Sequence, residues 1–178
     1  MDSKTNIMDG IFLLNPKRFS DQRGIFFEIF NQNRSYSQGI NIDFKQDNFS
    51  RSTKNVLRGL HFCKFKPQSQ LVTVLKGKII DVVVDLRINS PTFGKWNSFE
   101  LSDESISQIY MEKGFAHGFY VVSDYVDMHY KVSEIYNPKD DHGIIWNDKD
   151  LSIKWPSDDP IISNKDKSFP AFKDIKFI

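Results

Sequence analysis

The chain has 178 residues, of which 39% are hydrophobic and 16 are Phe, so it is long enough for one domain with a substantial core. Its 24 basic and 23 acidic residues leave a net charge of +1, which argues against a nucleic-acid-binding surface. The single cysteine, Cys63, excludes an intrachain disulfide and a cysteine-rich zinc site. Residues 1–10 hold no apolar signal segment and no run is long enough to span a bilayer, so we expect a soluble cytoplasmic protein without membrane contacts.

The first predicted elements in chain order are a strand over residues 25–30 and a short helix over residues 31–38. The strand alternates Phe and Ile so that both of its faces are largely apolar. Such a strand needs a packing partner on each side. Gly39 follows the helix and is typical of a helix end.

Three further strands are predicted over residues 71–75, 78–87 and 127–132. In the second, apolar residues alternate with a face that carries Asp81 and Asp85, a period of two with many β-branched residues. Lys76 and Gly77 between the first two favour a tight hairpin. In the third, Tyr130 shares its face with apolar residues.

Many short strands separated by Gly, Pro, Asn and Asp indicate an all-β barrel or sandwich. No repeat or linker divides the chain, so we expect one domain over residues 1–178, with residues 155–178 wrapping its surface. A small barrel of this kind holds one ligand in its mouth, which makes polar residues on inward faces candidates for a site.

Two polar clusters on short strands are the candidate site. Residues 46–50 and 58–61 contain amides, Arg58 and His61, and residues 114–119 place His117 between glycines. Taken alone, His61 would be a strand histidine with a satisfied hydrogen bond. Together with the other polar residues of these clusters, it becomes a candidate base. Arg58 and His61 have opposite parity, so both can face one cavity only if Gly59 permits a bulge.

Several other polar residues have ordinary structural interpretations. Tyr130 is typical of a core tyrosine with its hydroxyl at a rim, and Asp166 of a residue that caps a surface turn. Glu28 lies among phenylalanines, so it is either buried and paired or at a subunit contact. His61 and His117 alone make a poor ligand set for a metal, and residues 62–64 add neither a second His nor a Glu. We therefore expect a barrel with no metal and no cofactor.

Taken together, these residues resemble the nucleotide-sugar 3,5-epimerases of the dTDP-4-dehydrorhamnose type. The likeness runs in order along nearly the whole chain, through residues 19–28, 46–48, 55–62, 85–87, 90–96, 114–119, 130–131, 146–148 and 163–166. The resemblance implies a metal-free, cupin-type jelly-roll barrel with short peripheral helices. It also implies a homodimer in which an N-terminal segment completes the partner's site, with the C-terminal tail on the barrel or on the partner.

The resemblance also implies residue roles. His61 is similar to the base that removes the proton beside the ketone, Asp166 to its hydrogen-bonded orienter, and Tyr130 to the acid on the opposite sugar face. Such a set fits epimerisation of a nucleotide-linked 4-keto-6-deoxy sugar at carbons 3 and 5 through an enolate. The implied substrate-binding residues are Gln46, Asn48, Arg58, Gln70, His117, Tyr136 and Lys165, with Arg23, Phe26 and Glu28 reaching across the dimer.

The sequence departs from the family pattern at Gln70, where the family usually has a Lys that is thought to steady the enolate oxygen, and the preceding loop is one residue shorter. A Gln amide can donate a hydrogen bond but carries no charge. Glu112, where the family often has Pro, is a second departure. Two alternatives therefore stay open: an epimerase that acts at one carbon or on another nucleotide sugar, and a non-catalytic sugar-binding barrel. Retention of His61, Tyr130 and Asp166 favours an enzyme.

Overall fold

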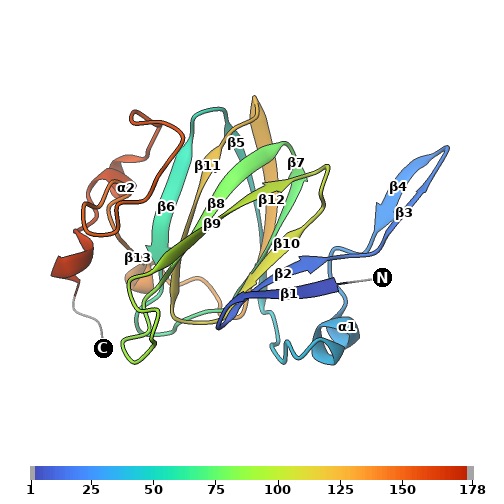
Figure 1. Cartoon of the computed structure of the whole chain (residues 1–178), viewed down its shortest axis with the longest axis horizontal. Helices are drawn as coiled ribbons and strands as arrows, with labels where there is room; N and C mark the ends of the chain where they lie inside the picture. Colours follow the sequence, from blue (N-terminus) through green and yellow to red (C-terminus); the bar gives the residue numbers. More distant parts are fainter. Residues whose placement is uncertain (1–2, 176–178) are drawn as a thin grey trace.

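The computed structural model describes residues 3–175 and folds them into two antiparallel sheets that face each other (Figure 1). The six-stranded sheet has the order β1-β2-β10-β7-β12-β5, and the five-stranded sheet the order β13-β6-β11-β8-β9. The first consists of β1 (Ser3–Met8), β2 (Ile11–Asn15), β5 (Gln46–Thr53), β7 (Gln70–Lys76), β10 (Gln108–Met111) and β12 (Tyr125–Val132). The second consists of β6 (Leu57–Phe62), β8 (Lys78–Asp85), β9 (Trp96–Ser102), β11 (Phe115–Val121) and β13 (His142–Gly143).

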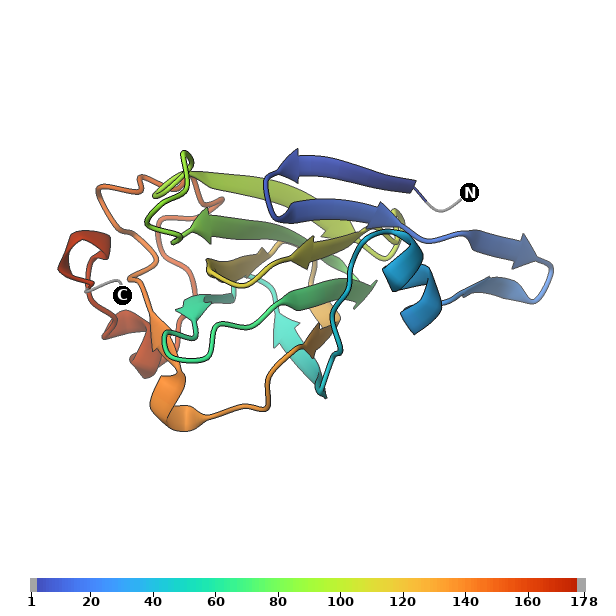
Figure 2. The same cartoon turned by 90° about the horizontal axis from the view of Figure 1, so that it is seen from below.

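The remaining elements are small and lie around these sheets. A hairpin of β3 (Arg18–Asp21) and β4 (Gly24–Phe27) extends beyond the barrel, at the end opposite the C-terminal segment (Figure 2). The helices are α1 (Gln32–Ser37), α2 (Asn164–Lys167) and the 3-10 turns η1 (Pro138–Asp140) and η2 (Phe172–Asp174). Two facing antiparallel sheets with short peripheral helices confirm the predicted all-β, cupin-type jelly roll. No helix within residues 3–175 is long and apolar enough to cross a membrane.

The alternating patterns located most of the predicted elements. Strands β7, β8 and β12 confirm the strands predicted over residues 71–75, 78–87 and 127–132, although β8 ends at Asp85. Helix α1 confirms the predicted helix, with Asn31 as its N-cap and Gly39 at a φ of +76° just beyond it. The strand predicted over residues 25–30 is shorter, because β4 ends at Phe27 and the chain then turns towards α1.

The hairpin predicted at Lys76 and Gly77 is wrong. Strand β7 pairs with β10 and β12, whereas β8 pairs with β11 and β9, so these two residues carry the chain from one sheet to the other. Gly77 has a φ of +86°, and a Cβ there would lie 2.2 Å from the carbonyl oxygen of Tyr125. Lys76 and Gly77 do form a tight connection, but β7 and β8 each form their hydrogen bonds with other strands of two different sheets.

Two apolar layers hold the barrel together and account for the apolar content of β8 on both faces. The inner layer lies between the sheets and includes Ile79 and Val83 of β8 with Val72 of β7. The outer layer packs the other face of the five-stranded sheet, including Val82 and Val84, against residues of the C-terminal segment such as Ile144, Leu151 and Phe172. The chain after β13 therefore covers the outer face of the five-stranded sheet. Residues 176–178 of the tail lie outside the described residues.

Candidate active site

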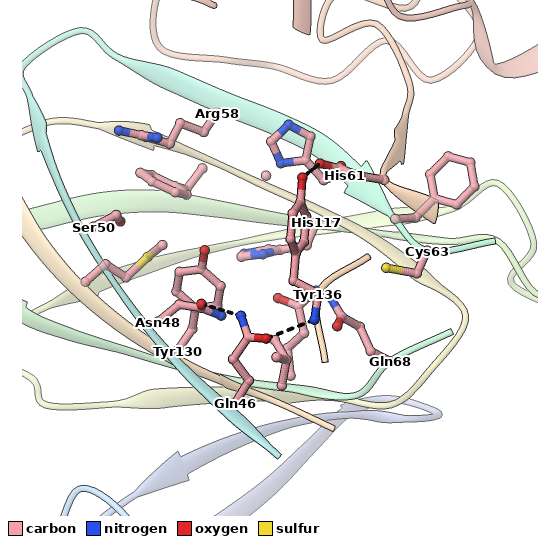
Figure 3. A pocket seen from close by; sticks show the side chains of 17 residues that line it. Gln46, Asn48, Ser50, Arg58, His61, Cys63, Gln68, His117, Tyr130 and Tyr136 are labelled. Atoms are coloured by element: carbon pink, nitrogen blue, oxygen red, sulfur yellow. Dashed lines mark hydrogen bonds between the residues drawn. The ribbon is translucent and has the colours of Figure 1, made fainter. Parts of the chain in front are cut away.

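A cavity of about 410 Å³ opens between the two sheets and collects most of the predicted site residues (Figure 3). Strands β5, β7 and β12 form one wall, and β6 and β11 form the other. Its lining includes the predicted residues Gln46, Asn48, Arg58, His61, Gln70, His117, Tyr130 and Tyr136. Residues predicted from separate parts of the sequence thus line one open cavity.

His61 stands on β6 with Asp166 behind it. The His61 Nε2 atom lies 3.0 Å from Oδ1 of Asp166, and Oδ2 of Asp166 accepts the backbone N–H of Gly59 at 3.0 Å. Asp166 is buried in the first turn of α2, whose N-cap is Ser163. Burial raises the pKa of Asp166, but the hydrogen bond and charge of His61 and the N–H of Gly59 outweigh it, so the net pKa is lowered. The carboxylate therefore stays ionised against the imidazole, and Asp166 is not a surface turn residue.

A bulge in β6 lets Arg58 and His61 face the same cavity, as the parity of the sequence required. His61 pairs with His117 and Arg58 with Phe119, so β6 advances one residue more than β11 between these pairs. Gly59 adopts a φ of +122°, and a Cβ there would lie 2.5 Å from the Cα of Gly118. Both glycines are needed because the two backbones approach this closely. The Arg58 side chain then donates to Ser52 Oγ at 3.0 Å.

His117, on the same wall, has its own carboxylate. Its Nε2 atom lies 2.7 Å from Oδ2 of Asp81, and the Asp81 side chain is fully buried on β8. Oδ1 of Asp81 has no hydrogen-bond partner among the described residues. Asp81 was not predicted as a site residue, but the sequence held a signal. An acidic residue that shares a buried strand face with Ile79 and Val83 needs a hydrogen-bonded partner.

The opposite wall places Tyr130 and Gln70 on neighbouring strands. Tyr130, on β12, faces the cavity together with Met128 and Val132, as the alternation predicted. Burial raises the pKa of the Tyr130 hydroxyl, the charge of Arg58 lowers it and that of Asp141 raises it, and the net pKa lies above the usual value. The phenol therefore carries its proton at neutral pH. Gln70 is the first residue of β7 and is buried.

Tyr136 and Asp141 form the rim of the cavity together with Gln46. The amide of Gln46 donates to Asn48 Oδ1 at 2.7 Å and its Oε1 accepts the backbone N–H of Tyr136 at 2.9 Å. The Tyr136 hydroxyl donates to Asp141 Oδ2 at 3.0 Å, and Lys165 donates to the same carboxylate oxygen. Lys165 thus lies beside the cavity without lining it, and links α2 to the rim.

The three residues predicted to reach across a dimer do not line this cavity. Arg23 and Phe26 lie on the β3–β4 hairpin, where Arg23 bonds Asp21 and Phe26 is 66% exposed. Glu28 follows the hairpin and accepts from Arg34 Nη1 at 2.8 Å. Figure 1 shows the hairpin pointing away from the barrel. Within one chain, these residues and the cavity are therefore apart.

Sequence reasoning missed some members of the lining. Asp141, Cys63 and Gln68 contribute to the cavity without standing in a pattern that singles them out, whereas Ser50 lies in the predicted cluster of residues 46–50 and shares the parity of Gln46 and Asn48. Burial and the charges of Asp140 and Asp141 raise the pKa of the Cys63 thiol to about 11, so it is a neutral wall residue. Within residues 3–175 no three His, Cys, Asp or Glu side chains form a group that could hold a metal ion.

The chain is similar to a group of known proteins over nearly its full length. A family model described as dTDP-4-dehydrorhamnose 3,5-epimerase matches residues 4–174. A dTDP-4-dehydrorhamnose 3,5-epimerase from Methanothermobacter thermautotrophicus is 45% identical over 170 residues, which cover 94% of this chain and 92% of the relative.

Solved structures show the same likeness. The dTDP-6-deoxy-D-glucose-3,5-epimerase of Legionella pneumophila, in complex with dTDP-4-keto-L-rhamnose, superposes with a TM-score of 0.96 at 41% identity, covering 99% of this chain and 95% of that one. A 3'-monoepimerase from Streptomyces bikiniensis, in complex with dTDP-quinovose, has a TM-score of 0.85 at 32% identity, covering 91% of this chain and 83% of that one.

Proposed function

The chain belongs to the dTDP-4-dehydrorhamnose 3,5-epimerase family, and we propose that its cavity epimerises a dTDP-linked 4-keto-6-deoxy sugar at carbons 3 and 5. The protein is an isomerase that acts on a carbohydrate. The observation that carries the assignment of roles is the position of His61 and Tyr130 on opposite walls of one cavity. A proton can leave one face of a sugar held between them and return to the other.

The chemistry follows from the partners of each group. A proton beside a ketone leaves as the carbonyl oxygen takes up the negative charge of an enolate. When Nε2 of His61 donates to Asp166, the other ring nitrogen carries the lone pair that accepts this proton. The ionised Asp166 then stabilises the imidazolium. Tyr130, which is protonated at neutral pH, supplies a proton to the opposite face of the carbon.

The remaining polar lining would bind the substrate. Arg58 brings a positive charge beside Tyr130, His117 is held in place by Asp81, and Gln70 offers an amide N–H to the enolate oxygen. Gln46, Asn48, Tyr136 and Lys165 border the mouth, where the nucleotide and diphosphate would lie. We propose no metal and no cofactor for this reaction, because proton transfer between a ketone and these side chains needs neither.

We also propose that residues 1–178 form a single cytoplasmic domain that works as a homodimer. Phe19, Ile25 and Phe26 are about half to two-thirds exposed on a two-stranded hairpin that has no core of its own. A hairpin of this kind is marginally stable alone, and neighbouring large apolar side chains that are exposed in this way are typical of an interface. Against a second copy it would deliver Arg23, Phe26 and Glu28 to the partner's cavity.

Incubation with dTDP-4-keto-6-deoxyglucose in heavy water tests the reaction. We expect deuterium at carbons 3 and 5, detected by NMR, with unchanged rates after treatment with a chelator. Deuterium at carbon 3 alone would support the single-carbon alternative, which the likeness to a 3'-monoepimerase keeps in view. Absence of exchange at both carbons, with the substrate bound, would contradict the proposed reaction, and the same incubation with other nucleotide 4-keto sugars would then separate an epimerase for another sugar from a sugar-binding barrel. Loss of activity on chelation, restored by one divalent ion, would overturn the proposal of a metal-free reaction.

A further inference from the structure

Asp140 binds three consecutive backbone N–H groups with one carboxylate. Oδ1 accepts from Lys64 and Phe65 at 2.8 Å each, and Oδ2 accepts from Lys66 at 2.7 Å. Asp140 is 3% exposed. Successive N–H groups that converge in this way form a concave anion site, which here is filled by a side chain of the same protein. Burial raises the pKa of Asp140, but the three N–H donors and the charge of His142 outweigh it and leave a net pKa below the usual value.

This contact joins two segments that both border the cavity. Residues 63–69 connect β6 to β7 and include Cys63 and Gln68 in the lining, whereas residues 133–141 follow β12 and include Tyr136 and Asp141. Asp140 lies directly before Asp141, the residue that accepts from Tyr136 and Lys165. A displacement of Asp140 would therefore move the carboxylate that orients Tyr136.

The same two segments are tied again at their other ends, but only by neutral groups. The backbone N–H of Ser69 donates to Ser133 Oγ at 2.9 Å, and the N–H of Ser133 donates to the carbonyl of Ser69 at 3.0 Å. On the Asp140 side, His142 stacks on Phe62 and meets the edge of Phe65. Asp140, whose Oδ1 atom also lies 3.6 Å from Nε2 of His142, is thus the carboxylate in a contact that otherwise consists of hydrogen bonds between neutral groups and ring packing.

We propose that Asp140 is a positioning residue that sets the width of the cavity mouth by holding residues 63–69 against residues 133–141. It acts on the substrate through Gln68 on one side and through Tyr136 and Asp141 on the other. The idea rests on the proposed function, since it assigns a part of the same site. Without the carboxylate, three N–H groups lose their acceptor, and residues 63–69 are no longer held against residues 133–141 at this point.

The test compares Asp140→Ala with Asp148→Ala as a matched control. Asp148 is also buried, and it accepts the backbone N–H groups of Asp150, Leu151 and Phe172 at 2.8–3.0 Å without lining the cavity. We expect Asp140→Ala to raise KM for the sugar nucleotide, and the calorimetric Kd for dTDP, by about tenfold, with kcat changed by less than about threefold, which is the effect of losing one charge-assisted bond from binding. Asp148→Ala should lower Tm and leave KM and Kd unchanged.

Formate offers a second readout, because its carboxylate is small enough to occupy the vacated N–H groups. Added formate should restore KM and Kd of Asp140→Ala towards the wild-type values. If Asp140→Ala does not fold, Asp140→Asn, which keeps one acceptor oxygen, takes its place and should show the same rise in KM. The proposal is overturned if KM and Kd are unchanged in the Asp140 variant, if Asp148→Ala raises them equally, or if formate has no effect on Asp140→Ala. The Kd for dTDP decides this even if the wild-type protein exchanges no deuterium, an outcome that would count against the proposed reaction instead.

Discussion

The Nε2 atom of His61 lies 3.0 Å from Oδ1 of Asp166, although 105 positions separate the two residues in the chain. The second oxygen of Asp166 accepts the N–H of Gly59, the residue that makes the bulge in β6. One carboxylate therefore holds both the imidazole and the backbone distortion that turns it towards the cavity. The position of α2, at the far end of the sequence, thus decides how a residue on β6 can act.

Replacement of His61 by Ala should abolish proton exchange at both carbons. Loss of a general base typically costs a factor of about 10²–10⁴ in rate. The His61 side chain is 40% exposed, so its removal should change Tm little. The measurement is deuterium wash-in followed by NMR, with His129→Ala as control, because His129 binds Asp47 outside the cavity lining. Wild-type exchange in His61→Ala would show that another group is the base.

Tyr130→Phe should separate exchange from inversion. The variant keeps the ring that fills the wall but loses the hydroxyl that donates a proton to the second face. We expect deuterium to enter from the His61 side while the yield of epimerised product falls by about 10²-fold or more. The two quantities are measured on one sample, as deuterium content and as stereochemistry by NMR. Equal losses of exchange and inversion would mean that Tyr130 does not act on a separate face.

Gln70→Lys tests the neutral amide on β7. No lysine is among the residues that line the cavity within the described chain, so the variant would add a cation near the enolate oxygen. A charge-assisted bond in place of a neutral one should speed exchange by about tenfold.

Comparison with Gln70→Ala makes the Gln70 result decisive. If both variants slow turnover, Gln70 is a tuned contact to the substrate and not a weakened substitute for a charge. If neither changes exchange at either carbon, Gln70 lies outside the reacting part of the site. Lys64 and Lys66, on the loop before β7, would then be the next candidates for the cation.

Mixing two inactive variants tests whether the β3–β4 hairpin contributes residues to the partner's cavity. An Arg23→Ala chain keeps its own His61, and a His61→Ala chain keeps its own Arg23. If the site is shared across a dimer, unfolding and refolding the two together should recover up to about a quarter of the wild-type rate, because half the dimers are mixed and each has one complete site. Light scattering measures the mass. No recovery in a confirmed mixed dimer, or full activity of a monomer, would contradict the shared site.

Acid should unfold the protein partly through Asp85. This buried carboxylate accepts from Arg87, Ser90 and Thr92, and although burial raises its pKa, these bonds lower it to about 2. Because the pKa of Asp85 is lower in the folded protein, its ionised carboxylate stabilises the fold at pH values above the unfolded pKa of 3.8. This contribution is lost as the pH falls towards about 2. At neutral pH it corresponds to about 2 kcal/mol.

Urea unfolding between about pH 7 and pH 2 measures this contribution. Asp85→Asn should lose about 2 kcal/mol at neutral pH and show a shallower fall below about pH 4 than the wild type. Asp124→Asn is the control, because the Asp124 side chain is 93% exposed. A variant with the same acid slope as the wild type would show that other carboxylates dominate acid unfolding.

Local alternation explains why the strands could be predicted. In β12 the side chains of Met128, Tyr130 and Val132 point to one face because successive residues of a strand alternate, and this period needs no tertiary contact to be visible. The same argument located β7 and β8 and placed Asp81 on one face of β8 with Ile79 and Val83. It also required the bulge at Gly59, since Arg58 and His61 could not otherwise share a cavity.

By itself the sequence determined the all-β class, the strands β7, β8 and β12 with their alternating faces, and the likeness to the epimerase family, because each depends on residue order or spacing of a few positions. Only the tertiary structure decided which sheet each strand joins, so that Lys76 and Gly77 connect two sheets instead of closing a hairpin. It also decided the geometry of the contact between Asp166 and His61, which only the family resemblance had implied, and it decided that Asp140 binds the backbone of residues 64–66. These contacts join residues more than 70 positions apart, and no local period records which distant segments will pack together.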